Sequence, residues 1–147
     1  MAYEEKIILL VEDNPDDETL TLRALQHSNL STRVDVVRDG TEALDYLFCR
    51  GIHAERDCSK KPKVIFLDVK LPKMDGAEVV KEIRENESTR HIPIVMLTTS
   101  TQESDMIRCY ENGANSYIKK PNDFNEFMQV VTLMGAYWLT LNTAPQD

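Results

Sequence analysis

Acidic side chains directly follow two short apolar runs of this 147-residue chain. Glu12 and Asp13 come after the run at residues 7–11, and Asp68 comes after the run at residues 64–67. Carboxylates that lie close together repel one another, so either their pKa values rise or a cation neutralises them. Carboxylate oxygens suit a hard cation such as Mg²⁺, with Mn²⁺ as the alternative, and such an ion keeps room for a phosphoryl oxygen. These positions predict a divalent-cation site, provided that the fold brings the two runs together.

Hydroxyl and ammonium groups follow two further apolar runs. Thr98 follows the run at residues 94–97, and Lys120 lies just beyond the run at residues 116–118. A threonine and a lysine can hold phosphoryl oxygens by neutral and charge-assisted hydrogen bonds, and a carboxylate is a competent nucleophile toward phosphorus. Because positioning and charge neutralisation supply most of the catalysis in phosphoryl transfer, this set of side chains indicates that chemistry.

The elements that must position these groups alternate along the chain. Apolar runs at residues 7–11, 34–37, 64–67, 94–97 and 116–118 are separated by longer amphipathic stretches. This alternation predicts an α/β fold with a doubly wound, five-stranded parallel sheet and five flanking helices. Residues just beyond the carboxyl ends of such strands share one crevice, where the groups named above would meet.

Capping residues mark the expected helix boundaries. Side chains that accept hydrogen bonds from first-turn amides precede four of the stretches: Asn14, Asp39, Asp75, and Asn122 or Asp123. Gly113 is expected to end the fourth helix.

Charge and cysteine usage exclude several classes of protein. The net charge of −8, from 17 Lys and Arg against 25 Asp and Glu, disfavours binding to nucleic acid. No apolar run approaches the roughly 18 residues of a membrane span, and the N-terminus does not resemble a signal peptide. Cys49, Cys58 and Cys109 form no CxxC pair, so we expect reduced thiols and neither a disulfide nor a zinc site. These features predict a cytoplasmic protein. Residues 49–63 are polar and basic, and we expect them to form a surface loop remote from the chemistry.

Two stretches carry motifs with a family resemblance. They are Val-Glu-Asp-Asn at residues 11–14 and Leu-Asp-Val-Lys-Leu-Pro-Lys-Met-Asp-Gly at residues 67–76. Together with Thr98, Tyr117 and Lys120, they resemble the CheY-like receiver domains of bacterial two-component response regulators, over about residues 5–135. The long segment before the third strand and Tyr-Trp-Leu at residues 137–139 are also similar to the single-domain regulators that pair with cyanobacterial and bacterial phytochrome kinases.

The resemblance implies a flavodoxin-like strand order, 2-1-3-4-5, and a role for each site residue. Asp68 would be the phosphoacceptor, taking a phosphoryl group from a sensor histidine kinase of the phytochrome type. Asp13 and Asp68 would bind Mg²⁺ directly, Glu12 through water, and Lys70 through its backbone carbonyl. No enzymatic activity is expected beyond self-catalysed transfer to Asp68 and autodephosphorylation.

The same resemblance implies a switch. Thr98 and Lys120 would hold the phosphoryl oxygens, and Thr98 moving inward would leave space that Tyr117 fills. The peptide bond between Lys120 and Pro121 would be cis.

No second domain is expected, so residues 1–147 are interpreted as one receiver domain with a core at about 5–141 and a short tail at 142–147. Output must then be contact with a downstream protein that the sequence does not identify. One apolar stripe of the last helix should bury against the sheet: Phe127, Val131, Met134, Trp138 and Leu141. A second stripe, Val130, Leu133 and Tyr137, either packs under a neighbouring segment or forms a homodimer interface.

The Lys70 and Ser100 side chains should border the path of a hydrolytic water, unless Lys70 points into solvent. A lysine at that position could pair with the phosphoryl group and prolong the life of the phosphorylated state.

Other functions remain open. A Mg²⁺-dependent phosphatase with an aspartyl nucleophile would need a second Asp two residues later, where Lys70 stands. A flavodoxin-like electron carrier would need a phosphate loop where this chain has acidic residues. A receiver that acts as a scaffold without being phosphorylated is the third alternative.

Overall fold

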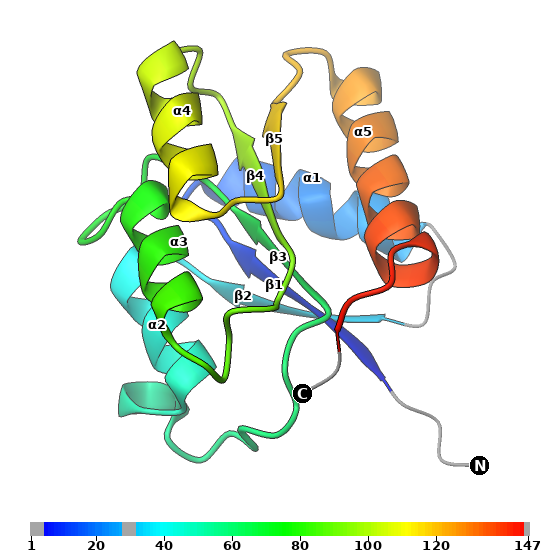
Figure 1. Ribbon diagram of the computed structural model, residues 1–147. Coiled ribbons are helices and arrows are strands. Elements are labelled where there is room, and N and C mark those ends of the chain that lie inside the picture. The colour runs from blue at the N-terminus through cyan, green and yellow to red at the C-terminus, as the bar shows by residue number, and fades with distance from the viewer. Residues whose placement is uncertain (1–4, 28–31, 146–147) are drawn as a thin grey trace.

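The computed structural model describes residues 5–27 and 32–145, and strands alternate with helices throughout (Figure 1). The strands are β1 (Lys6–Val11), β2 (Thr32–Val37), β3 (Val64–Leu67), β4 (Ile94–Thr98) and β5 (Ser116–Lys119). The helices are α1 (Pro15–Gln26), α2 (Gly40–Phe48), α3 (Gly76–Glu85), α4 (Glu103–Asn112) and α5 (Phe124–Ala136), with a 3₁₀ turn η1 (Gly51–His53) and a terminal π-helical turn η2 (Tyr137–Leu141). Within the described ranges, no helix combines the length and the apolar character needed to cross a bilayer.

The sheet is parallel, with strand order β2-β1-β3-β4-β5, as the doubly wound fold requires. The prediction of fold class is therefore confirmed. β1 and β3 are neighbours, and their last residues, Val11 and Leu67, are paired in register. The Asp68 amide continues the ladder by donating to the Val11 carbonyl at 3.2 Å. The residues that follow the two strands are consequently forced to lie side by side.

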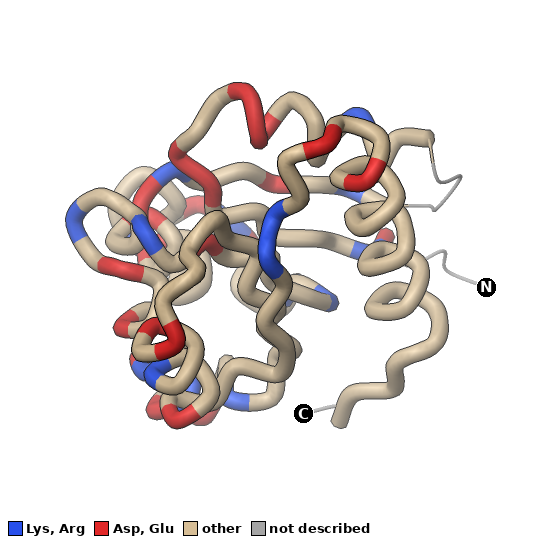
Figure 2. The backbone as a smooth tube through the Cα atoms, turned by 90° about the horizontal axis from the view of Figure 1, so that it is seen from above, with Lys and Arg blue, Asp and Glu red and all other residues tan. Residues whose placement is uncertain are grey.

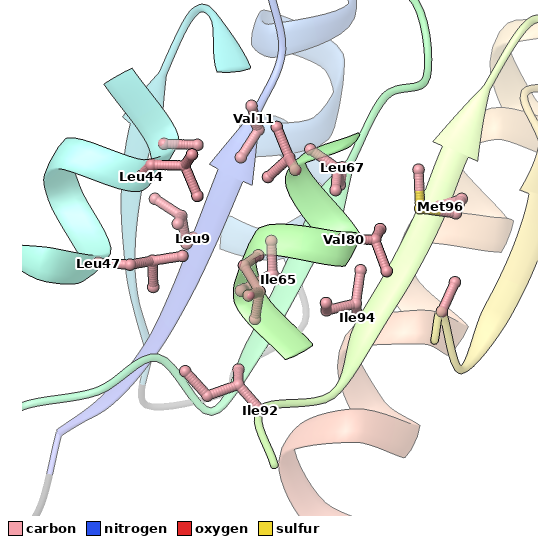
Figure 3. Packing of buried hydrophobic residues seen from close by; sticks show 14 of the residues in the cluster. Leu9, Val11, Leu44, Leu47, Ile65, Leu67, Val80, Ile92, Ile94 and Met96 are labelled. Atoms are coloured by element: carbon pink, nitrogen blue, oxygen red, sulfur yellow. The ribbon is translucent and has the colours of Figure 1, made fainter. Parts of the chain in front are cut away.

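The sheet is covered on both faces, which explains why its central strands are apolar without interruption. Alternate residues such as Leu9 and Ile65 face a core cluster completed by α2, α3 and α4 (Figure 3). Their neighbours, such as Ile8 and Phe66, face a second cluster completed by α1 and α5. Burial on both sides fixes the strand register, which in turn fixes where the residues that follow the strands lie at the carboxyl edge.

The predicted helix boundaries agree with the structure. Asn14, Asp39, Asp75 and Asp123 each accept a hydrogen bond from first-turn backbone amides of the helix that follows. Gly113 ends α4 with φ of 113°, a left-handed conformation that a side chain would strain.

The end of the last helix differs from its expected pattern. Phe127, Val131 and Met134 are buried as predicted, but Leu141 is 73% exposed and Leu139 is buried in its place. The reason is the π-helical turn, in which the Asn142 amide donates to the carbonyl five residues earlier, at 2.8 Å. That spacing shifts the phase of the stripe, so a period of 3.6 residues predicts the wrong side chain there.

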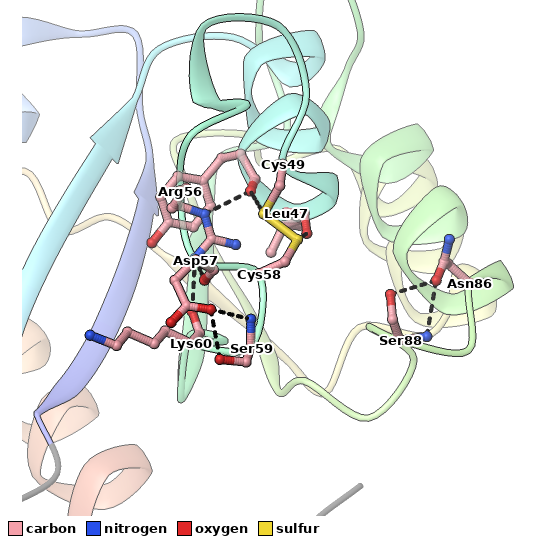
Figure 4. The surroundings of a disulfide bond; sticks show 10 residues. Leu47, Cys49, Arg56, Asp57, Cys58, Ser59, Lys60, Asn86 and Ser88 are labelled. Atoms are coloured by element: carbon pink, nitrogen blue, oxygen red, sulfur yellow. Dashed lines mark hydrogen bonds between the residues drawn. A yellow bond between two sulfur atoms is a disulfide. The ribbon is translucent and has the colours of Figure 1, made fainter.

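The expectation of three reduced cysteines was wrong, because Cys49 and Cys58 form a disulfide (Figure 4). Cys49 ends α2 in the left-handed conformation, with φ of 54°, and η1 then turns the chain back. Arg56 holds the loop closed: its Nε donates to the Tyr46 carbonyl at 2.9 Å and its guanidinium lies 4.0 Å from the Tyr46 ring centre. The two Cα atoms are thereby 5.9 Å apart, within the range of a disulfide. Sequence spacing alone does not reveal this loop geometry.

Reduction of this disulfide is expected to lower the free energy of unfolding by about 2–3 kcal/mol, because the closed loop is short and the cross-link restricts mainly the unfolded chain. The contacts of Arg56 do not involve the disulfide, so we expect the protein to stay folded after reduction. Urea denaturation with and without reductant measures the difference. The Cys58→Ser variant serves as the control and should show no effect of reductant; a parent whose unfolding is equally insensitive would contradict the prediction.

Candidate functional site

The carboxyl ends of β1 and β3 bring three carboxylates together. Oxygens of Glu12, Asp13 and Asp68 all lie within 4.8 Å of one another. Glu12 and Asp68 are buried, whereas Asp13 is exposed at the rim. Seen from above, acidic and basic segments are interspersed over this end of the molecule (Figure 2). The convergence that the sequence suggested for these three residues is therefore present in the structure.

Lys120 supplies the cation within this cluster. It follows β5, and its amide donates to the Thr98 carbonyl at 2.8 Å. Its ammonium, 3% exposed, lies 2.5 Å from Glu12 Oε1, 2.8 Å from Asp17 Oδ2 and 2.9 Å from Asp68 Oδ2. Sequence reasoning did not assign Asp17 to the site, since an acid in the first turn of a helix is explained equally well by the helix dipole.

Burial and charge perturb both kinds of group in the cluster. Burial raises the pKa of Glu12 to about 7, helped by the charge of Asp68 and opposed by Lys120. Burial lowers the pKa of Lys120, but the carboxylates of Asp68, Asp17 and Glu12 outweigh it, so the net shift is upward. The lysine therefore stays charged, and one ammonium faces more carboxylates than it can neutralise. An all-oxygen set of donors with excess negative charge fits a divalent cation such as Mg²⁺ or Mn²⁺.

Gly76 allows the motif at residues 67–76 to fold back tightly on itself. A Cβ at this position would lie 2.1 Å from the Asp68 carbonyl oxygen, so only glycine fits. The Gly76 amide donates to the Val69 carbonyl at 2.7 Å, which anchors the start of α3 directly beside Asp68. The loop after β3 is thus held against the carboxylates by its own backbone.

Thr98 and Tyr117 lie on the neighbouring strands β4 and β5. Thr98 is fully buried, and its Oγ1 accepts a hydrogen bond from the Ser100 amide at 3.1 Å. Tyr117 is partly buried, and its hydroxyl donates to the Ser100 carbonyl at 3.4 Å. Both residues of the expected switch therefore contact one loop. The expected cis bond between Lys120 and Pro121 was wrong: the described residues contain no cis peptide bond, and trans is the lower-energy form.

The backbone of Lys70 borders the site, whereas its side chain extends toward α4. Its amide donates to Asp68 Oδ1 at 3.4 Å. Its ammonium, 63% exposed, lies 3.3 Å from Oδ2 of Asp105 on α4, and the Ser100 hydroxyl donates to that same oxygen at 2.6 Å. The side chains of Lys70 and Ser100 thus share a partner that sequence reasoning did not single out. Metal binding by the Lys70 carbonyl stays a prediction.

The Lys120→Met substitution should lower the free energy of unfolding by about 3–5 kcal/mol in the presence of a chelator, because it leaves buried carboxylates without their counter-charge. In millimolar Mg²⁺ the loss should be smaller, since the cation neutralises the same oxygens. Thermal or urea unfolding under both conditions provides the test.

Lys119→Met is the matched control, since it removes one exposed ammonium from the adjacent residue. An equal loss for Lys120→Met with and without Mg²⁺ would show that lysine and metal do not share these carboxylates.

Comparison with known proteins agrees with this geometry. The model of the response regulator receiver domain matches residues 8–132. The probable methanogenesis regulatory protein FilR2 of Methanothrix harundinacea is 42% identical over 144 residues, which cover 98% of this chain and 90% of the relative. The phosphorylated cyanobacterial phytochrome response regulator RcpA has a similar structure, with a TM-score of 0.90 and 38% identity over 97% of this chain and 100% of the other. The Mn²⁺-bound form of response regulator Rcp1, a protein of Synechocystis, gives a TM-score of 0.88 and 36% identity over 96% of this chain and 99% of the other.

Proposed function

The chain belongs to the response regulator receiver domain family, and from that premise we propose that Asp68 accepts a phosphoryl group from a sensor histidine kinase. The observation that carries this proposal is the shared contact of Lys120 with Glu12 and Asp68, beside Asp13 at the same edge of the sheet. We interpret the protein as a single-domain response regulator, whose chemistry is limited to self-catalysed transfer onto Asp68 and autodephosphorylation.

In the proposed transfer, an Asp68 carboxylate oxygen attacks the phosphorus of a phosphohistidine. The new O–P bond forms as the P–N bond breaks, and the imidazole leaves with the electron pair and takes a proton from water. Asp13 and Asp68, with Glu12 through water and the Lys70 carbonyl, would hold a divalent cation, which supplies charge neutralisation when bound. Lys120 exchanges part of its contact with the carboxylates for a phosphoryl oxygen, so no buried charge loses its partner.

The proposed switch follows from what Thr98 must do. Its hydroxyl, now the acceptor for the Ser100 amide, turns toward a phosphoryl oxygen as a donor. The loop that carries Ser100 then shifts, and the Tyr117 hydroxyl, which donates to the Ser100 carbonyl, moves with it. The phosphoryl group shifts the population between these two packings because it interacts better with one of them.

Labelling with a small acyl phosphate tests the proposed acceptor. In Mg²⁺, the parent should gain the mass of one phosphoryl group, and Asp68→Asn or addition of a chelator should abolish the gain. Asp16→Asn, which removes an exposed carboxylate from the nearby first turn of α1, is the control and should be labelled like the parent.

Labelling of Asp68→Asn to the extent of the parent would refute the assignment. A parent that takes up no phosphoryl group would favour a phosphorylation-independent scaffold. Release of phosphate well beyond one equivalent per protein would favour the phosphatase alternative. Lys70 argues against that alternative, because such a phosphatase would need an Asp at this position.

We propose a phytochrome-type histidine kinase as the phosphoryl donor. RcpA is described as a phytochrome response regulator, and the bacteriophytochrome response regulator AtBRR is 48% identical to this chain with a TM-score of 0.75. The cytoplasm is the proposed location on the basis of family membership alone, because the disulfide between Cys49 and Cys58 removes cysteine usage as an argument for it.

We also propose that the protein forms a homodimer through α5 and η2. Large apolar side chains of these elements are exposed: Phe124 at 48%, Leu133 at 70%, Tyr137 at 47% and Leu141 at 73%. Beside them lies an apolar hollow of about 390 Å³, lined by Met128, Gln129, Thr132 and Leu133. A helix face with this much apolar exposure is typical of an interface, and a second copy offers the same face.

Leu133→Glu should shift the protein from dimer to monomer, because it places a charge at the centre of the proposed interface. Sedimentation at micromolar concentration, with and without a phosphoryl analogue, measures the effect. Ile52→Glu is the matched control, since Ile52 is 83% exposed on the distant turn η1. A parent that sediments as a monomer under both conditions would refute the dimer.

A further inference from the structure

A buried carboxylate lies on α4, outside the cluster that contains Asp68. Asp105 stands in the first turn of α4 and is 4% exposed. Its Oδ2 accepts the Ser100 hydroxyl at 2.6 Å and lies 3.3 Å from the Lys70 ammonium. One carboxylate oxygen thus joins α4 to both loops that border the phosphoacceptor.

We propose that Asp105 is a positioning residue that holds Lys70 and Ser100 in the unphosphorylated arrangement, and that a phosphoryl group on Asp68 competes with it for Lys70. This inference rests on the proposed function of Asp68. It assigns to α4 an electrostatic influence on the reaction that acts through Lys70, because the Asp105 side chain touches no reacting atom itself.

The contacts of Ser100 connect Asp105 to the proposed switch. The Ser100 amide donates to Thr98 Oγ1 at 3.1 Å, and the Ser100 carbonyl accepts the Tyr117 hydroxyl at 3.4 Å. While Asp105 holds the Ser100 hydroxyl, the loop keeps Thr98 as an acceptor and Tyr117 in its present position. Asp105 is therefore linked through Ser100 to both residues of the proposed switch.

Asp105 is also tied into the start of α3. Arg108, one turn further along α4, lies 3.9 Å from Asp105 Oδ1 and 3.2 Å from Oδ2 of Asp75, the residue that caps α3. Asp105 therefore retains a cation and a hydroxyl partner when Lys70 leaves. The carboxylate stays compensated, and what changes is the tether between α4 and the loop after β3.

Competition for Lys70 follows from charge and reach. A phosphoryl group carries a charge of about −1.5 to −2 at neutral pH, more than the single charge of a carboxylate. The Lys70 amide already lies 3.4 Å from Asp68 Oδ1, and its long, mostly exposed side chain can turn to either anion at little cost. Linkage is reciprocal, so if the phosphoryl group weakens the hold of Asp105 on Lys70, removal of the Asp105 charge must strengthen binding of the phosphoryl group.

Titration with beryllofluoride and Mg²⁺, a stable mimic of the phosphoryl group, tests this coupling. Asp105→Asn keeps the shape of the side chain and an acceptor for Ser100 but removes the charge that holds Lys70. It should tighten binding of the mimic about two- to five-fold, the range expected for one partly exposed ion pair. In a Lys70→Met background, Asp105→Asn should have no such effect, which a purely structural role would not predict.

Glu103→Gln is the matched control, because it removes an exposed negative charge from the same turn of α4. Equal tightening by Glu103→Gln and Asp105→Asn, or tightening by Asp105→Asn that persists in the Lys70→Met background, would overturn the inference while leaving Asp68 as the acceptor. An Asp105→Asn variant that binds the mimic with the affinity of the parent would also overturn the inference while leaving Asp68 as the acceptor. A parent that binds no mimic would overturn the proposed function, and the inference with it.

Discussion

The ammonium of Lys120 lies among buried carboxylates, and the rest of the site depends on that contact. Glu12 and Asp68 lie close together in a buried site, where a cation offsets the cost of burying their charges, and among the described residues the Lys120 ammonium contacts these two side chains and Asp17. The fold imposes the contact: β1 and β3 are neighbours in register, and the segment after β5 reaches them across the end of β4. The cluster still carries excess negative charge, so it is suited to a divalent cation and then to an incoming phosphoryl group.

Much of this arrangement is predictable from sequence, because few physical rules control it. Uninterrupted apolar runs such as residues 64–67 identify strands that are covered on both faces. Parallel strands have their carboxyl ends at one edge, so carboxylates that directly follow two such strands must meet if those strands are adjacent. Glu12, Asp13 and Asp68 were identified in this way, and helix capping by Asp75 was identified from its residue type and position.

What the sequence did not reveal depends on local geometry without a periodic signature. Asp17 and Asp105 look like ordinary first-turn acids, and only the folded loops show that one binds Lys120 and the other binds Lys70 and Ser100. The burial of Leu139 in place of Leu141 depends on one π-helical turn. The disulfide was missed for the same reason, since a loop that doubles back leaves no trace in cysteine spacing.

The most direct test of the central claim is an anomalous difference map from crystals grown with Mn²⁺ and beryllofluoride. The account predicts a single strong metal peak between the carboxylates of Asp13 and Asp68, with the beryllium group on Asp68 and its fluorides facing Lys120 and Thr98. A metal peak away from these carboxylates, or a Lys120 ammonium that still contacts only carboxylates while the mimic is bound elsewhere, would contradict it.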